Sequence, residues 1–215
     1  MLTDAINGSR IPPYFEFFRR EILDVVPAEA KCVLSVGCAS GRTEAELVKR
    51  GIKVIGVEIN PEAAQMARQR GLTILEGDAS EIDIDVVKEP YDCLIYADVL
   101  EHLTNPVAVL KRHVKSLKPG GIVYVSVPNF RRYSVFWELF IRGHINYVEG
   151  GILDRTHLRI TTKRMVLEWF ESAGVDPVNV IYYLARRRDK LISACLFGLA
   201  KDFIATQIYL IGTKH

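Results

Sequence analysis

Three carboxylates follow short apolar runs and are placed to hold the hydroxyl groups of one ligand. Glu58 ends the run KVIGVE, while Asp78 and Asp98 directly follow LTILEG and YDCLIYA. If these runs are neighbouring parallel strands, their carboxyl ends meet in one crevice, where an acid can accept hydrogen bonds from the hydroxyls of a ribose. A single acid of this kind is usually a surface residue or a helix cap. Three in succession favour a shared site.

The sequence SVGCASG, residues 35–41, adds a turn at which a ligand can come close to the backbone. The helix that follows such a turn offers its first N–H groups and a partial positive charge to a polar ligand. Glu58 lies 21 residues after Gly37, a spacing at which a ribose-binding acid follows a nucleotide-binding turn. Nicotinamide dinucleotide sites have the pattern G-x-G-x-x-G, whereas Ala39 makes this turn G-x-A-x-G. We therefore predict a different adenosine-like ligand.

Two histidines, His102 and His157, are the candidate proton acceptors. A neutral imidazole accepts a hydroxyl proton at physiological pH. His157 lies in the sequence DRTHLR, where Asp154 or Arg159 could orient its ring. The alternative for His157 is a hydrogen bond that only fastens a loop. We predict that both histidines are catalytic.

An alternation of strands and helices positions these residues. Short runs rich in Val and Ile predict buried strands at residues 32–36, 53–58, 72–77, 91–97 and 121–127. The intervening segments contain helix formers and end in Gly or Pro-Gly. A parallel, doubly wound sheet follows from this alternation. Further predicted elements are helices at 12–26, 161–173 and 190–200 and strands at 178–184 and 204–212.

Five motifs carry a family resemblance over residues 14–175. In chain order they are VLSVGCASG, VIGVEINPEAAQMA, EGDAS, YDCLIYADVLEHL and LKPGGIVYVSVPN. With them the chain resembles the class I S-adenosylmethionine-dependent methyltransferases, particularly the small bacterial and archaeal group that includes the ubiquinone-biosynthesis O-methyltransferases. The resemblance implies a Rossmann-like, doubly wound sheet of seven strands, mostly parallel with an antiparallel last strand, and helices on both faces. It also implies S-adenosyl-L-methionine as cofactor, S-adenosyl-L-homocysteine as product and a small-molecule methyl acceptor.

The same resemblance implies where the cofactor is held. The turn would carry its amino-acid part, Glu58 its ribose, Asp78 its adenine and Asp98 its methionine side. The full set of predicted cofactor-binding residues is Gly37, Cys38, Ala39, Gly41, Glu58, Ile59, Asp78, Ala79, Ala97 and Asp98.

Two residues depart from the family pattern. Ser35 stands where the family usually has an acid, and Ala39 stands where it usually has a second glycine. Alanine adds one methyl group, so we expect the turn to close. We predict methyl transfer, with oxygen as the preferred accepting atom. The alternatives are N- or C-methylation by the same fold, or a weakened SAM-binding or regulatory module, against which the retained Asp98, His102 and His157 argue.

A metal is a further alternative at residues 98–102. Asp98, Glu101 and His102 would share one face if this segment were helical. In the ubiquinone-type enzymes the corresponding acid, acid, histidine pattern can bind a divalent metal. We predict no metal, because this short motif is widespread in methyltransferases that use none. Asp98 would then face the cofactor, Glu101 would be solvated and His102 would line the pocket.

The composition predicts one reduced, cytoplasmic domain. Its 215 residues suit a single methyltransferase domain with an N-terminal helical cap (1–30), a cofactor-binding core (31–127), a substrate lid (128–160) and a C-terminal part of the sheet (161–215). The four cysteines form no CxxC pair, and the N-terminus lacks the order of a signal peptide. A net charge of +2 and the sequence ADVL after the fourth strand carry no nucleic-acid signature. The oligomeric state is left open.

The segment RRRDKLISACLFGLAKDF, residues 186–203, joins a basic start to an apolar helix. This pattern suits reversible contact with an anionic membrane surface, but its apolar stretch is too short to span a bilayer. We expect the helix to be buried against the sheet. No stable membrane insertion and no sedimentation with anionic vesicles would follow.

Overall fold

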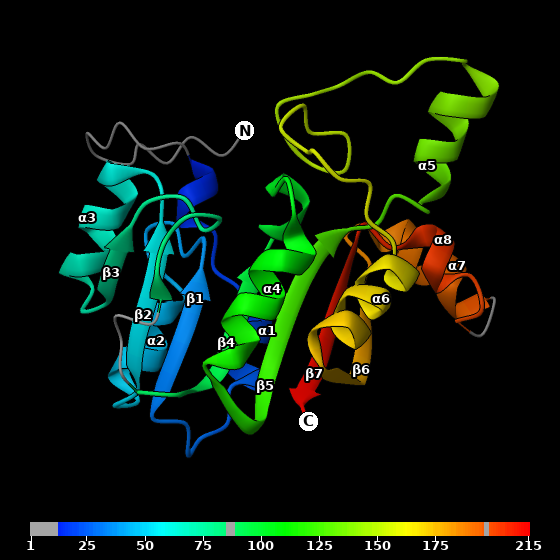
Figure 1. Cartoon of the computed structure of the whole chain (residues 1–215). Coiled ribbons are helices and arrows are strands. Elements are labelled where there is room, and N and C mark those ends of the chain that lie inside the picture. The colour runs from blue at the N-terminus through cyan, green and yellow to red at the C-terminus, as the bar shows by residue number, and fades with distance from the viewer. Residues whose placement is uncertain (1–12, 85–88, 196–197) are drawn as a thin grey trace.

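A seven-stranded sheet organises the chain in the computed structural model, which describes residues 13–84, 89–195 and 198–215 (Figure 1). The strands are β1 (Cys32–Val36), β2 (Lys53–Glu58), β3 (Thr73–Glu76), β4 (Tyr91–Ala97), β5 (Leu117–Pro128), β6 (Val175–Tyr183) and β7 (Gln207–Lys214). Their order across the sheet is β3-β2-β1-β4-β5-β7-β6.

The strand directions confirm the predicted fold class. β1 to β5 run parallel to one another, and β7 runs antiparallel to both of its neighbours, β5 and β6. The predicted ranges of β1, β2 and β4 agree with the structure residue for residue, because each is a continuous apolar run that the sheet buries. β5 begins earlier than predicted, because Leu117 already pairs with Tyr91 before a shift in register.

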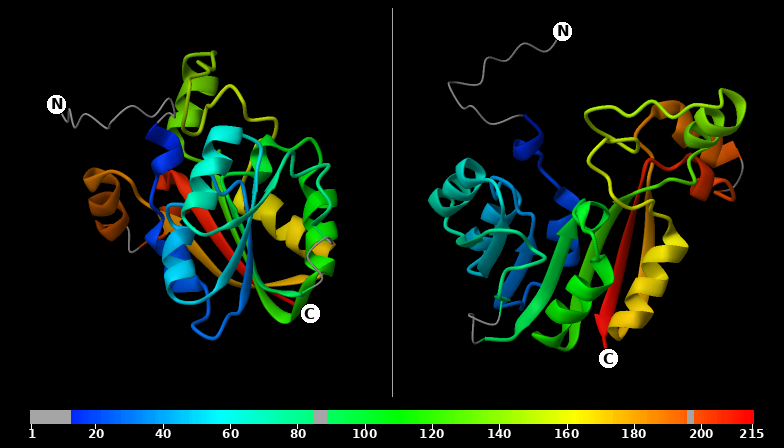
Figure 2. Two further views of the ribbon diagram at one scale, coloured as in Figure 1. Left: turned by 90° about the vertical axis from the view of Figure 1, so that its left-hand side faces the viewer. Right: turned by 45° about the horizontal axis from the view of Figure 1, so that its top comes forward.

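Helices cover both faces of the sheet (Figure 2). One face packs against α1 (Arg20–Val25), α2 (Glu44–Lys49) and α3 (Pro61–Gln69), and the other packs against α4 (Pro106–Lys115) and α6 (Lys163–Ala173). The starts of α3, α4 and α6 follow from local chemistry: the side chains of Asn60, Asn105 and Thr162 accept hydrogen bonds from backbone N–H groups of the first turn.

The predicted helix at 12–26 is wrong in its continuity. The chain forms a short 3-10 helix, η1 (Pro13–Glu16), then an extended link, and then α1. Arg19, at the start of α1, has φ −114° and ψ 87°, which breaks the helix there. The link crosses the end of the sheet where β1 and β4 end, and so reaches the candidate site.

The predicted burial of the helix near 190–200 is also wrong. The chain there forms α7 (Arg187–Cys195) and α8 (Lys201–Ile204). Leu191 and Leu199 are 68% and 87% exposed, whereas the buried side chains of α7 are Asp189 and Ser193. The apolar side of this segment therefore points away from the sheet.

The irregular segment after β5 contains α5 (Tyr133–Phe136) and a π-helical turn, η4 (Trp137–Ile141), and then returns to α6. Figure 1 shows α5 and the loop after it standing above the end of β5. Within the described ranges, no helix has the length and apolar character needed to cross a membrane.

Candidate active site

The turn after β1 holds three residues in the left-handed region. Gly37, Ala39 and Gly41 have φ values of 68°, 50° and 70°. A methyl group on Gly37 would lie 2.5 Å from Cγ2 of Val99, so only glycine fits there. Alanine enters this region at a cost of roughly 1–2 kcal/mol. Ala39 thus forms the turn that glycine would form.

Glu58 fastens this turn to the end of β2. Its carboxylate accepts the N–H of Ala39 at 2.8 Å and the N–H of Asn60 at 2.8 Å, one on each oxygen. The residue is only 5% exposed. Because each carboxylate oxygen can accept two hydrogen bonds, Glu58 keeps acceptor capacity for the hydroxyl groups of a ligand.

A cavity of about 410 Å³ opens at the carboxyl ends of β1 to β4. This volume suits a small-molecule or cofactor site. The side chain of Ile59, which is 65% exposed, forms an apolar part of the cavity wall. Seven of the predicted cofactor residues line this cavity: Gly37, Ala39, Glu58, Ile59, Asp78, Ala79 and Asp98.

A smaller cavity shares the turn with the large one. Cys38 and Ala97, two further predicted cofactor residues, line it. Two side chains of opposite charge, Arg19 and Glu44, line it as well. The remaining predicted residue, Gly41, lies in neither cavity and packs against Leu72.

Glu44 places its carboxylate beside Ser35, the residue at which the family pattern usually has an acid. The Ser35 hydroxyl donates to Oε1 of Glu44 at 2.8 Å, and the two residues are 1% and 5% exposed. Burial raises the pKa of the Glu44 carboxyl. A cation in the small cavity would therefore stabilise its ionised form.

An N-terminal strap, residues 15–19, lies across the turn. Ser40 donates its hydroxyl to the carbonyl of the strap's first residue at 2.8 Å, and the hydroxyl of Thr43 accepts the strap's last N–H at 2.9 Å. Arg70 forms an ion pair with Glu16 at 2.9 Å. The sequence predicts a continuous helix here and not a strap; the signal for the strap is the aromatic and basic run FEFFRR, residues 15–20, just before α1.

Asp98 lines the large cavity, and its carboxylate also binds the strap. Its carboxylate accepts hydrogen bonds from Ser126 at 2.6 Å, from Gln207 at 2.7 Å and from the guanidinium of Arg19. Its backbone φ of +58° aims the residue at these donors. The ion pair holds Arg19 at the edge of the small cavity.

The segment after Asp98 forms a 3-10 turn, η3 (Leu100–His102), not a helical face shared by three ligands. Glu101 points inward and is fully buried, and neither carboxylate oxygen has a hydrogen-bond partner in the described part of the chain. The expectation of a solvated Glu101 is wrong. Burial, with the nearby charge of Asp98, raises the pKa of Glu101 well above its ordinary value.

The two histidines meet beside the large cavity. Their rings lie edge to face with centroids 4.9 Å apart, and His102 lines the cavity whereas His157 does not. Nδ1 of His102 lies 3.2 Å from the carbonyl of Thr156, and Nδ1 of His157 lies 3.1 Å from the carbonyl of Ile152. A carbonyl only accepts, so the hydrogen sits on Nδ1 and Nε2 becomes the acceptor of each neutral ring. Burial, and then His157, lower the pKa of His102.

Asp154 and Arg159 act on the loop and not on the His157 ring. The Asp154 carboxylate accepts the N–H and the hydroxyl of Thr156 at 2.8 Å and 2.6 Å. Arg159 donates to the carbonyl of Thr104. The backbone N–H of Arg159 donates to the carbonyl of Glu101 at 3.0 Å, which holds this segment against η3.

Glu101, His102 and His157 bring one potential ligand atom each to within 4.8 Å of one another. This trio differs from the one considered from sequence, because His157 takes the place of Asp98. A carboxylate with two imidazoles is a donor set that divalent metals accept. The two imidazoles of this trio are also potential acceptors of a hydroxyl proton. The absence of a metal stays a prediction.

Comparison with known proteins shows what this chain resembles. Residues 13–180 match the family model described as "Methyltransferase domain". A ubiquinone biosynthesis O-methyltransferase of Cereibacter sphaeroides is 27% identical over 168 residues, which cover 75% of this chain and 67% of that protein. One from Idiomarina loihiensis is 31% identical over 156 residues, covering 70% of this chain and 63% of that protein.

Solved structures share the fold. A SAM-dependent methyltransferase from Archaeoglobus fulgidus has a TM-score of 0.68 at 17% identity, covering 91% of this chain and 90% of its own. A possible histamine N-methyltransferase from Thermotoga maritima has a TM-score of 0.63 at 19% identity, with coverages of 91% and 86%.

Proposed function

Because the chain belongs to the methyltransferase domain family and is an S-adenosylmethionine-dependent methyltransferase, we propose that it methylates an oxygen atom of a small molecule. The observation that carries this proposal is the convergence of His102, His157 and Glu101 beside the large cavity. A hydroxyl must lose its proton during methylation, whereas a neutral amine attacks with its lone pair. The names of the relatives from Cereibacter and Idiomarina agree with oxygen as the acceptor.

The residues of the two cavities fit the cofactor. Glu58 would accept the ribose hydroxyls, and Ile59, Asp78 and Ala79 would surround the adenine in the large cavity. The small cavity presents a cation, Arg19, and a carboxylate, Glu44, to the amino-acid end. A zwitterionic amino acid carries the complementary pair of charges.

Bound S-adenosylmethionine supplies a methyl group on a positively charged sulfur, ready for in-line displacement. The chain's own residues orient the acceptor and remove its proton. Nε2 of His102 is the nearer acceptor, because this ring lines the large cavity. His157 packs edge to face against the His102 ring, and one of its ring nitrogens lies within 4.8 Å of one of His102, so it would serve as a second acceptor.

Glu44 is expected to carry part of the cofactor affinity. Glu44→Ala should raise the Kd of S-adenosylhomocysteine at least tenfold, because a hydrogen bond to a charged group contributes about 1.5–3 kcal/mol. The double variant Ser35→Asp, Glu44→Ala should recover most of that loss, since it returns a carboxylate to the same place. Titration calorimetry measures both values.

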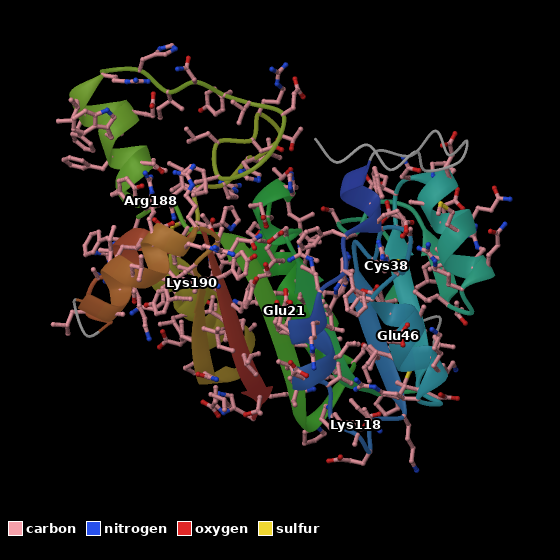
Figure 3. The ribbon with its side chains drawn as sticks, turned by 180° about the vertical axis from the view of Figure 1, so that it is seen from behind. Glu21, Cys38, Glu46, Lys118, Arg188 and Lys190 are labelled. Atoms are coloured by element: carbon pink, nitrogen blue, oxygen red, sulfur yellow. The ribbon has the colours of Figure 1, made fainter. Side chains whose placement is uncertain are left out.

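The control for that pair of variants is Glu46→Ala on the same helix, because the Glu46 side chain is 40% exposed and pairs with Lys49. Glu46 is labelled in Figure 3 on α2, below Cys38 of the turn. Its loss should leave the Kd unchanged. An unchanged Kd for Glu44→Ala would remove Glu44 from the proposed site.

The rate should depend on pH through His102. The base must be neutral, and the pKa of His102 is lowered from an ordinary value of about 6.5. We therefore expect kcat/KM to rise with pH through an inflection below that value and to stay level from neutral pH upward. His102→Asn should remove the inflection. An inflection clearly above neutral pH in the unmodified protein would contradict His102 as the base.

A matched pair of acceptors tests the accepting atom. Phenols and the anilines of the same skeleton are incubated with S-adenosylmethionine, and the product is identified by mass spectrometry and NMR. We expect methyl ethers from the phenols, unchanged by added EDTA. Exclusive methylation of the anilines would favour the N-methyltransferase alternative, and activity that EDTA removes and a divalent ion restores would assign a metal to the Glu101 cluster.

A further inference from the structure

The helix α7 is packed with its polar side inward. Asp189 is fully buried and pairs with Arg132 at 2.7 Å, and the side chain of Arg132 is itself only 3% exposed. Arg132 also donates to the carbonyl of Ile204, at the end of α8. This buried ion pair fixes the rotation of the helix, because turning it would leave two buried charges unpaired. Leu191 therefore cannot turn toward the sheet.

The turn formed by α5 and η4 is joined to α7 and α8. Arg188 donates to the hydroxyl of Tyr133, and Arg131 pairs with Asp202. The Arg131 guanidinium also stacks 4.5 Å from the ring centre of Phe203. Figure 3 shows the labelled Arg188 between α7 and α5, so the two pieces lie side by side. We call residues 131–142, 186–195 and 198–203 together the docking face.

The docking face exposes apolar side chains that a protein in water normally buries. Phe136 of α5 and Phe140 of η4 stack with ring centres 4.7 Å apart. The exposed apolar side chains of the face, from 44% to 87% exposed, are Phe136, Trp137, Leu139, Phe140, Ile141, Leu191, Ile192, Leu199 and Phe203. Nine exposed apolar side chains on two joined segments are typical of a protein or membrane contact.

Charge identifies the partner. The docking face holds eight of the chain's 28 Lys and Arg residues but three of its 26 Asp and Glu residues, so the rest of the chain carries a net negative charge. Arg186, Arg187 and Lys190 are exposed beside the apolar side chains of α7. Aromatic and aliphatic side chains with Arg and Lys around them match a bilayer interface, where apolar groups enter the acyl boundary and cations meet anionic headgroups.

We propose that the docking face binds reversibly to the surface of an anionic lipid bilayer. It lies flat on the headgroups, with Trp137, Phe140 and Leu191 entering the apolar boundary and Arg187 and Lys190 contacting phosphate groups. This reverses the expectation from sequence, which depended on burial of the helix against the sheet. The contact needs neither cofactor nor methyl acceptor, so its test is independent of the proposed reaction.

Vesicle flotation with the full chain tests the proposal. The chain contains two tryptophans, and Trp169 is 9% exposed whereas Trp137 is 52% exposed, so a change in emission on binding reports Trp137. Vesicles of phosphatidylcholine alone are compared with vesicles that also contain phosphatidylglycerol. We expect flotation and a blue shift of the emission with the anionic vesicles, at least tenfold weaker binding to the neutral ones, and release at high salt.

Two double variants, each with a matched control, separate the contribution of the apolar side chains to membrane binding from that of the charges. Phe140→Asp with Leu191→Asp changes two side chains that are each 68% exposed, and Val178→Asp, 64% exposed on β6, is the control. Arg187→Glu with Lys190→Glu reverses the exposed charges, and Lys111→Glu, exposed on α4, is its control. Both double variants should lose flotation, and both controls should keep it.

Three results would overturn the proposal. The first is no flotation with either kind of vesicle. The second is equal binding by the double variants and the controls. The third is a dimer in sedimentation velocity that Phe140→Asp dissociates while vesicles fail to compete, which would make the face an interface between copies of this chain.

Discussion

His157→Ala is expected to lower kcat roughly 100-fold or more, because general base catalysis contributes about 10² to 10⁴ to a rate. The Kd of S-adenosylhomocysteine should not change, since His157 lines neither cofactor cavity. Single-turnover methyl transfer and titration calorimetry measure the two quantities. The proposal is that His157 acts on the acceptor proton together with His102.

The control for this variant is His157→Asn. Its amide can still donate to the carbonyl of Ile152, which the ring now reaches from Nδ1 at 3.1 Å, but it cannot take a proton. If His157 only fastens the lid, the asparagine variant should keep its turnover. We expect it to be as slow as the alanine variant; full activity of His157→Asn would assign a structural role instead.

Glu58→Ala should weaken binding of S-adenosylhomocysteine about 100-fold or more, because the carboxylate would receive two ribose hydroxyls and each charge-assisted bond contributes about 1.5–3 kcal/mol. The variant also leaves the backbone N–H groups of Ala39 and Asn60 without their acceptor, so the melting temperature of the free protein should fall as well. Calorimetry and a thermal scan give the two numbers.

The control for Glu58 is Glu76→Ala. Glu76 is the register partner of Glu58 on β3, lies in neither cavity and pairs with Arg68 at the surface. Its loss should leave the affinity unchanged. If Glu58→Ala lowers the melting temperature of the free protein but binds S-adenosylhomocysteine as tightly as the unmodified protein, Glu58 only fastens the turn at Ala39.

The strands and the large cavity follow from local sequence. Runs such as those of β1, β2 and β4 are buried on both faces, so their composition alone marks where they start and stop. The acids at the strand ends also lie where parallel pairing places them: Glu58, Asp78 and Asp98 line one cavity. These features depend on neighbours in the sequence and on one rule of sheet topology.

The remaining parts of the site depend on contacts between distant segments. Arg19 reaches Asp98 from 79 residues away, and His157 reaches His102 from a separate loop. Glu101 turns inward because Asp98 adopts a left-handed φ and η3 is a 3-10 turn, neither of which its helical spacing reveals. α7 turns its polar side inward because Asp189 pairs with the buried Arg132, 57 residues earlier in the chain.

We expect a working cofactor site in spite of Ser35 and Ala39. Ala39 takes the left-handed conformation of the turn, and Glu44 brings a carboxylate to Ser35. We therefore expect Ala39 and Glu44 to do what a glycine at residue 39 and an acid at residue 35 do in the family pattern. This geometry favours a working methyltransferase over a regulatory module that has lost its cofactor affinity.

Thermal unfolding with S-adenosylmethionine, S-adenosylhomocysteine and NAD in parallel tests whether the turn and its two cavities bind the cofactor. A ligand at about 100 times its Kd stabilises the folded state by about 2.7 kcal/mol, which raises the melting temperature of a domain of this size by roughly 5–10 °C. We expect this shift with both sulfur nucleosides and none with NAD. No shift with either sulfur nucleoside would contradict a working cofactor site and favour the regulatory module.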